Sequence, residues 1–271
     1  MKNYISEEVL KLICLISHPR SGSTALMKKI EQETNSAAVL EIFHPHEDVI
    51  CQHLNEGLGK DATEGVKASL GIKEIKPFGL TNPVSYINKL KDAALSKGNQ
   101  SLLFKIFPDH LRDESKLKEV LSISDYVIVL RRNTLQSYIS NKKAIKVGTY
   151  ANVDTSDIKV DFDSNEFISW RRNIYSFFDS VCSICSEVGK EISSFNYEDL
   201  YFGEDSNMDF LYDSIMLDVK QPSKVKNILR KQDNNKTATG KVNNEKEMMS
   251  FLLDKGWQTM DSVIEADLVG E

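Results

Sequence analysis

Three features are scarce in this 271-residue chain: cysteine, an excess of positive charge, and long apolar runs. The formal net charge is −6, so we expect neither a strongly basic face nor a nucleic-acid partner. No apolar run approaches the ~20 residues that cross a bilayer. Glu7 and Glu8 stand where a signal peptide would have its apolar region. We therefore expect no membrane span and a cytoplasmic location, while the composition does not indicate an oligomeric state.

Only four cysteines occur, at Cys14, Cys51, Cys182 and Cys185. The last two have the spacing of half a zinc or redox site, but neither a second such pair nor a nearby histidine pair accompanies them. Their aromatic neighbours are typical of the middle of an amphipathic helix. We therefore expect buried thiols there and no metal site.

Hydrophobic residues make up 41% of the chain and charged residues 27%, which is typical of a globular protein. Apolar runs alternate with helical patterns, which favours an α/β fold. We expect one domain over residues 1–271, with a P-loop-like three-layer fold whose mostly parallel central sheet has about five strands flanked by helices. The expected strands are 12–16, 37–43, 100–107, 125–130 and 191–197; the expected helices are 23–34, 83–94, 111–121, 167–188, 208–217 and 245–253.

Two details of the connections are also predicted. Asn82 is placed to cap the helix that begins at Pro83. The polar segments 146–164 and 232–244 are expected to be loops, and both are candidates for lids over a bound acceptor.

The first expected strand runs directly into Ser17-His18-Pro19-Arg20-Ser21-Gly22-Ser23-Thr24 and a helix start. Backbone N–H groups at a helix N-terminus favour an anion. Gly22 lets the backbone approach a ligand closely, Ser23 and Thr24 offer hydroxyl donors, and Arg20 offers a fork that matches phosphate or sulfate. The Gly-Lys pair of the triphosphate-binding loop is missing, so the pattern predicts a nucleotide with fewer phosphates.

A second candidate anion site follows the fourth expected strand, which ends in Arg131-Arg132. Ligands bind at the carboxyl ends of strands in open α/β sheets, which is where these two cations would lie. Ser140 comes eight residues after Arg132 and would fall about two turns along the next helix.

The sequence Pro-Arg-Ser-Gly-Ser-Thr after a hydrophobic strand resembles the 5′-phosphosulfate loop of sulfotransferases. The pair Arg132 and Ser140 resembles their 3′-phosphate segment, nearest to the bacterial trehalose sulfotransferase type. The resemblance runs from Ile13 to about Lys231. It implies 3′-phosphoadenosine 5′-phosphosulfate (PAPS) as donor without a metal, adenosine 3′,5′-bisphosphate as product, and a hydroxyl of a sugar or small metabolite as acceptor.

The resemblance also implies which residues bind the donor. Tyr197 matches the tyrosine of a Tyr-Glu-Asp-Leu segment after the fifth strand, and Arg230 with Lys231 resembles a later basic element. The glycine-rich stretch that follows this element in cytosolic sulfotransferases is missing here. The implied donor-binding residues are Arg20, Ser21, Gly22, Ser23, Thr24, Arg132, Ser140, Tyr197, Arg230 and Lys231.

Sulfuryl transfer needs a base for the acceptor hydroxyl and cations near the leaving phosphate. Arg20 is the first candidate cation, and Lys105, on an otherwise apolar strand, is the second. Phe107 stands where cytosolic sulfotransferases have a histidine. We therefore prefer Glu41, which resembles the glutamate of trehalose-type enzymes, as the base. The alternatives are His44, His46 and His110.

Two other functions stay open at this point. One is a nucleotide or small-metabolite kinase of the P-loop fold, although its loop lysine and acidic magnesium ligand are not evident. The other is a non-catalytic nucleotide-binding protein that would bind adenosine 3′,5′-bisphosphate without turnover.

Overall fold

The computed structural model describes residues 10–150, 153–202, 206–220 and 238–257. At its centre lies a five-stranded sheet in which every neighbouring pair is parallel, in the order β2-β3-β1-β4-β5. Its strands are β1 (Lys11–Ile16), β2 (Ser36–Ala38), β3 (Ser101–Ile106), β4 (Tyr126–Arg131) and β5 (Ile192–Asn196). The expected α/β fold with a parallel sheet flanked by helices is confirmed.

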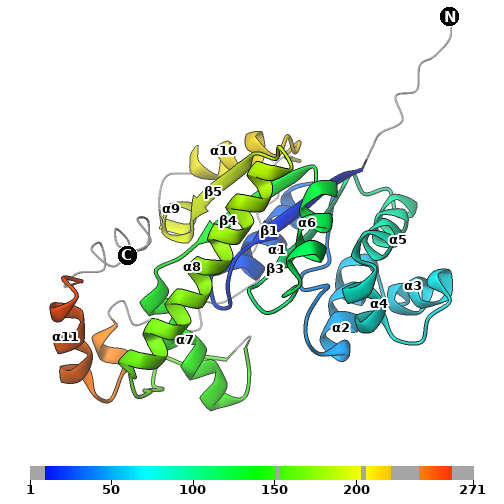
Figure 1. Cartoon of the computed structure of the whole chain (residues 1–271). Helices are drawn as coiled ribbons and strands as arrows, with labels where there is room; N and C mark the ends of the chain where they lie inside the picture. The colour runs from blue at the N-terminus through cyan, green and yellow to red at the C-terminus, as the bar shows by residue number, and fades with distance from the viewer. Residues whose placement is uncertain (1–9, 151–152, 203–205, 221–237, 258–271) are drawn as a thin grey trace, which may run out of the picture.

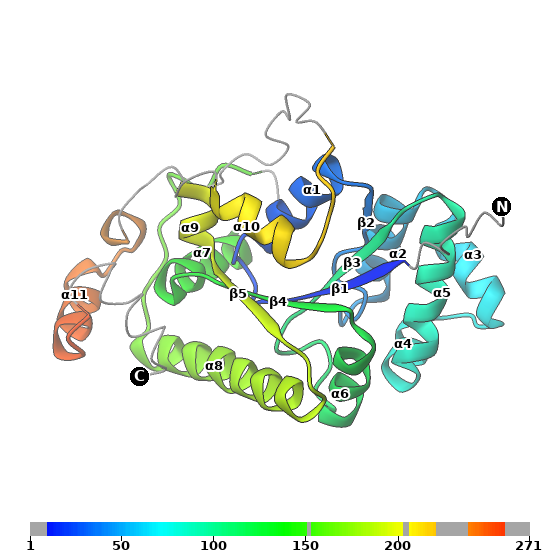
Figure 2. The ribbon, with the colours of Figure 1, turned by 90° about the horizontal axis from the view of Figure 1, so that it is seen from above.

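Helices cover both faces of the sheet (Figures 1 and 2). Successive side chains of a strand point to opposite faces, so β1 and β3 contribute to two separate apolar cores. One core includes α1 (Ser23–Glu33), α9 (Tyr197–Phe202) and α10 (Ser206–Ser214). The other includes α2 (Glu47–Leu58), α3 (Ala62–Leu70), α4 (Ile75–Thr81), α5 (Pro83–Ser96), α6 (Glu114–Ile123) and α8 (Ser164–Glu187).

A third apolar cluster lies beside the sheet. It packs α7 (Thr134–Val147) and the start of α8 against the 3₁₀ turn η1 (Thr239–Lys241) and α11 (Glu245–Asp254). The turn and α11 lie at one end of the molecule in Figure 2. None of the helices that the structure describes has the length and apolar character to cross a membrane.

The strand order creates a switch point between β1 and β4. The chain leaving β1 leads to β2 on one side of the sheet, and the chain leaving β4 leads to β5 on the other side. Connections that diverge in this way open a crevice at the carboxyl ends of the two strands, where open α/β sheets bind their ligands. The loop before α1 and the Arg131-Arg132 segment both lie at this crevice.

The second strand is shorter than predicted. It ends at Ala38 rather than at Phe43, although the backbones of Val39 and Leu40 still bond to β3. The strand stops because Leu40 has a φ of 47°, in the left-handed region, and the chain turns immediately afterwards. A branched side chain in this conformation is strained, and such strain is often found at functional sites.

The differences from the prediction at helix starts include one shifted boundary and one missing cap. The helix expected from Leu111 begins at Glu114, because the Asp113 side chain accepts a hydrogen bond from the Ser115 backbone at 2.9 Å and caps the helix there. Asn82 does precede α5, but its side chain makes no capping bond and donates to the Thr81 hydroxyl instead.

Two further segments differ from the prediction in detail. Cys185 is buried in α8 as expected, but Cys182 is exposed. Helix α7 continues to Val147, so the irregular part of 146–164 begins at Gly148. Its far end is anchored, since buried Val160 forms a parallel bridge to Val242.

A helical glycine holds α2 close to β2. A Cβ on Gly57 would lie only 2.3 Å from the Ala38 carbonyl oxygen, which is a severe steric overlap. A Cβ on Gly65 in α3 would meet nothing within 4 Å. Gly57→Ala should therefore destabilise the protein although alanine favours helix. Gly65→Ala should stabilise it by up to about 1 kcal/mol. Urea denaturation of both variants measures this difference, and equal shifts would show that the close approach is not required.

Candidate anion-binding and catalytic site

The loop between β1 and α1 packs against Tyr197 at Gly22, where a side chain would overlap the tyrosine ring. Gly22 is the N-cap of α1 with a φ of 85°, and Arg20 has a φ of 66°. A Cβ on Gly22 would overlap the ring of Tyr197, which comes from the start of α9. The loop thus leaves backbone N–H groups at the α1 N-terminus, the arrangement that binds anions.

The two arginine segments meet at the crevice. Arg132 Nη1 donates to the Arg20 carbonyl at 2.6 Å, and Arg20 Nε donates to Ser140 Oγ at 3.0 Å. The Arg20 guanidinium also donates to the Tyr150 carbonyl. Residues separated by more than a hundred positions thus form one cationic cluster. Ser140 contacts Arg20 in this arrangement, rather than the Arg132 with which its spacing paired it.

Tyr197 covers the second cation. The Arg132 guanidinium lies 4.3 Å from the centre of the Tyr197 ring, a cation–π contact. The Tyr201 ring centre lies 4.5 Å from that of Tyr197. Arg132 Nε is buried and has no hydrogen-bond partner among the residues that the structure describes. A buried guanidinium N–H without a partner is costly, and an anion bound beside Arg132 would satisfy it.

Lys105, on β3, contacts the start of α1, where the loop ends. Alternation along β3 places it on the face of Leu103, which is the face that α1 covers. Its side chain is 1% exposed, and Nζ donates to Thr24 Oγ1 at 2.6 Å. The same Nζ lies 3.0 Å from Glu41 Oε1. Lys105 thus links the start of α1, beside the candidate anion-binding loop, to Glu41, the carboxylate predicted as the base.

Glu41 is surrounded by imidazole N–H groups. The Nδ1 of His110 accepts from the Phe107 backbone, and the Nδ1 of His44 accepts from the His46 backbone. Each ring is therefore in the neutral tautomer that carries its proton on Nε2. Those Nε2 atoms lie 3.5 Å and 3.9 Å from Glu41 Oε2. In this geometry His110 donates to the Glu41 carboxylate, while His44 faces it from beyond hydrogen-bond distance.

Burial and charge act on Glu41 in opposite directions. Burial alone would raise the pKa of the Glu41 carboxyl, but the charge of Lys105 and the hydrogen bond from His110 outweigh it and hold that pKa well below its usual range. Burial lowers the pKa of Lys105, and Glu41 opposes this shift. The Glu41 carboxyl is therefore held in its charged form, and Glu41 is a weak base while Lys105 stays in contact.

Two residues of this region, His53 and Lys241, were not predicted as site residues from the sequence. The Nδ1 of His53, on α2, accepts from the Glu41 backbone N–H at 3.3 Å, and burial lowers its pKa to about 4. Buried Lys241 donates to Gln136 Oε1 at 2.8 Å, one helical turn before Ser140 on α7. Neither residue is part of a recognisable motif, since only the fold brings them here.

The remaining predicted residues divide into three groups. Ser21 and Ser23 are buried in the loop, where the Ser21 hydroxyl accepts from the Ser23 backbone at 3.3 Å. His46 is exposed at the rim and contacts Glu41 only through His44. Arg230 and Lys231 lie outside the described residues. Within the described ranges, no cluster of three or more His, Cys, Asp or Glu could hold a metal ion.

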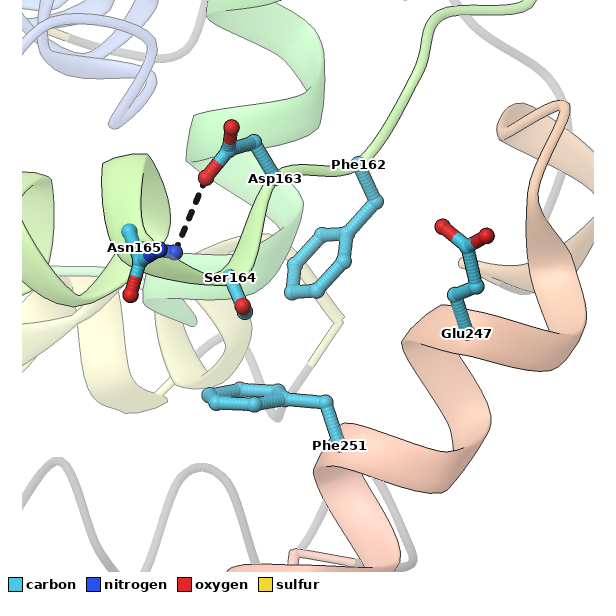
Figure 3. A pocket seen from close by; sticks show the side chains of 6 residues that line it. All are labelled: Phe162, Asp163, Ser164, Asn165, Glu247 and Phe251. Atoms are coloured by element: carbon cyan, nitrogen blue, oxygen red, sulfur yellow. Dashed lines mark hydrogen bonds between the residues drawn. The ribbon is translucent and has the colours of Figure 1, made fainter.

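A hollow of about 240 Å³ lies elsewhere, between the start of α8 and α11 (Figure 3). Its carboxylates already serve the fold: Asp163 accepts from the backbones of Asn165 and Glu166, and Glu247 accepts from the Asn244 side chain. None of its lining residues belongs to the cluster around Arg20 or Glu41. The chemistry-bearing residues therefore lie at the sheet edge and not in this hollow.

Comparison of the chain with protein-family models and with curated proteins finds no match. The fold and the site define an α/β protein with a parallel sheet and, at its switch point, a cationic loop joined to a buried lysine–glutamate pair.

His18, at the base of the loop, predicts a pH dependence. It is fully buried, and burial lowers its pKa from 6.5 to about 4. The unfolded chain binds this proton more readily, so its contribution of up to about 3 kcal/mol is complete above pH 6.5 and is lost on descending towards pH 4. His18→Asn should flatten urea-measured stability across that window. Exposed His46→Asn is the control, and an unchanged slope in His18→Asn would contradict the assignment.

Proposed function

We propose that this chain is a sulfotransferase that moves a sulfuryl group from PAPS to a hydroxyl of a sugar or small metabolite. The observation that carries the proposal is the contact of Lys105 Nζ with both Thr24 of the loop and Glu41. It puts a cation between an anion-binding loop and a carboxylate, which is the order of groups that sulfuryl transfer needs. A cytoplasmic location and a carbohydrate acceptor belong to the same proposal.

Two features of the site fit the donor. Gly22, with its left-handed φ, caps α1, whose N-terminal backbone N–H groups suit the 5′-phosphosulfate, and Arg20 lies two residues before it. The unpartnered Nε of Arg132 and the nearby Ser140 hydroxyl suit the 3′-phosphate. Tyr197, stacked on Arg132, presents an aromatic surface at the same edge. These cations come from arginine and lysine, so the proposed donor needs no metal.

The proposed reaction divides between these groups. Glu41 takes the proton of the acceptor hydroxyl as the acceptor oxygen forms its bond to sulfur. The bond from sulfur to the bridging oxygen breaks, and its electron pair stays on the 5′-phosphate of the leaving adenosine 3′,5′-bisphosphate. Lys105 and Arg20 stabilise that growing negative charge. His110 and His44 hold the Glu41 carboxylate towards the acceptor.

Nucleotide binding provides the first test. Adenosine 3′,5′-bisphosphate at 100 times its dissociation constant should stabilise the protein by about 2.7 kcal/mol without magnesium. The measurement is a thermal shift in the presence of a chelator, with ATP and magnesium as the comparison. A shift with ATP and magnesium but none with the bisphosphate would reject the sulfotransferase proposal in favour of a kinase.

The assignment of the 3′-phosphate gives a second prediction. Arg132→Ala removes a charge-assisted contact worth about 1.5–3 kcal/mol, so bisphosphate affinity should fall by roughly 10- to 150-fold. Ser140→Ala should weaken binding less. Exposed Arg172→Ala on α8 carries the same charge change and should leave affinity unchanged. Calorimetric titration checks this, and wild-type affinity in both site variants would refute the assignment.

The base is tested by turnover. Glu41→Gln keeps the size of the side chain and loses its basicity, so transfer should slow by about 10²–10⁴-fold. A screen of sugars and phenols with labelled PAPS identifies the acceptor first. Full turnover in Glu41→Gln, together with loss of turnover in His110→Ala, would move the base to His110.

A further inference from the structure

Lys105 has two partners that belong to different halves of the site. Nζ lies 2.6 Å from Thr24 Oγ1 on the anion-binding loop and 3.0 Å from Glu41 Oε1. Its side chain is almost completely buried, at 1% exposure. An ammonium in such a place depends on these contacts for the hydrogen bonds that water would otherwise provide. An anion that enters beside Thr24 therefore meets a cation that Glu41 already holds.

We propose that the anionic donor and Glu41 compete for Lys105, so that donor binding releases the carboxylate to accept the proton of the acceptor hydroxyl. Lys105 is then a positioning residue as well as a cation for the leaving group. This inference rests on the proposed function, because it concerns the order of events at the same site. It predicts that Glu41 becomes an effective base only after the donor has bound.

The flexibility of lysine makes such an exchange possible. Its ammonium is a compact charge with three donors at the end of a flexible stem. The attraction between two charges falls inversely with their separation, so a small movement of Nζ away from Glu41, towards an anion bound beside Thr24, weakens its hold on Glu41. Arg20 approaches the same lysine and lowers its pKa, so an anion bound between the two cations relieves their repulsion.

The other neighbours of Glu41 keep it in place during the exchange. His110 and His44 face Oε2 with Nε2 N–H groups, while Lys105 faces Oε1. His53 holds the Glu41 backbone N–H from α2. Because both facing imidazoles are in the neutral tautomer, they orient the carboxylate without pairing its charge. Loss of the Lys105 contact thus leaves Glu41 oriented and raises the pKa of its carboxyl, which makes it a stronger base.

Reciprocity between the two partners gives a test that needs no acceptor. If the donor weakens the contact of Lys105 with Glu41, removal of the Glu41 charge must strengthen nucleotide binding by the same factor. Glu41→Gln should bind adenosine 3′,5′-bisphosphate at least about fivefold tighter than wild type, the lower end of typical coupling between sites. General damage to the site would weaken binding, so a gain in affinity is specific to competition or to direct repulsion.

A double-mutant cycle separates those two causes. In the Lys105→Met background, Glu41→Gln should change affinity by less than about twofold if the lysine carries the effect. An equal gain in both backgrounds means that Glu41 repels the nucleotide directly, and this outcome overturns the proposal. Glu119→Gln is the matched control, since it makes the same charge change at a surface pair with Lys116.

A spectroscopic measurement covers the case in which Lys105→Met does not fold. Infrared difference spectra of the protein with ¹³C-carboxyl-labelled glutamate should show a carboxylate band that shifts on addition of the bisphosphate. The shift should be absent in Glu41→Gln and present in Glu119→Gln. A wild-type protein that binds the bisphosphate without this shift overturns the inference and leaves the proposed function standing. A wild-type protein that does not bind the bisphosphate overturns the proposed function itself.

Discussion

The site depends on one buried positive charge. Lys105 lies inside the sheet layer at 1% exposure, and an ammonium there is tolerated only with close polar partners. Glu41 and Thr24 are those partners, and they come from the end of β2 and the start of α1. The carboxyl ends of β1, β2 and β3 must therefore lie close together. A parallel sheet meets this requirement, because the carboxyl ends of its strands share one edge.

The backbone has positive φ values in both segments that lead to the partners of Lys105, the loop before α1 and the turn after β2. Arg20, Leu40 and Gly22 all have positive φ values, and two of the three are not glycine. The turn at Leu40 directs Glu41 to Lys105, and the bends at Arg20 and Gly22 shape the loop that ends at Thr24. Strain of this kind persists only where the surrounding packing maintains it. Here the packing includes the contact of Gly57 with Ala38, which fixes α2 against β2 just before the turn.

Much of the fold was predictable because apolar periodicity reports burial directly. All five strands and the six expected helices occur where the pattern placed them, apart from shifts at their ends, but α2, α3 and α4 were not among those six. The failures were local: Asn82 does not cap, Cys182 faces solvent, and the second strand stops at Ala38. Each depends on a side-chain direction or a single backbone angle. Such details are set by neighbours distant in the sequence, which periodicity does not describe.

The sequence by itself determined the parts of the site: a loop with Arg20 and Gly22, a pair of arginines after a strand, and a lysine in an apolar run. Local spacing and residue chemistry carry this information. Tertiary structure alone decided the contacts, which join Arg20 to Ser140, Lys105 to Glu41 and His53 to the Glu41 backbone. These pairs come from separate connections, and their distances depend on strand order and on the turn at Leu40. No local pattern in the chain encodes either of those features.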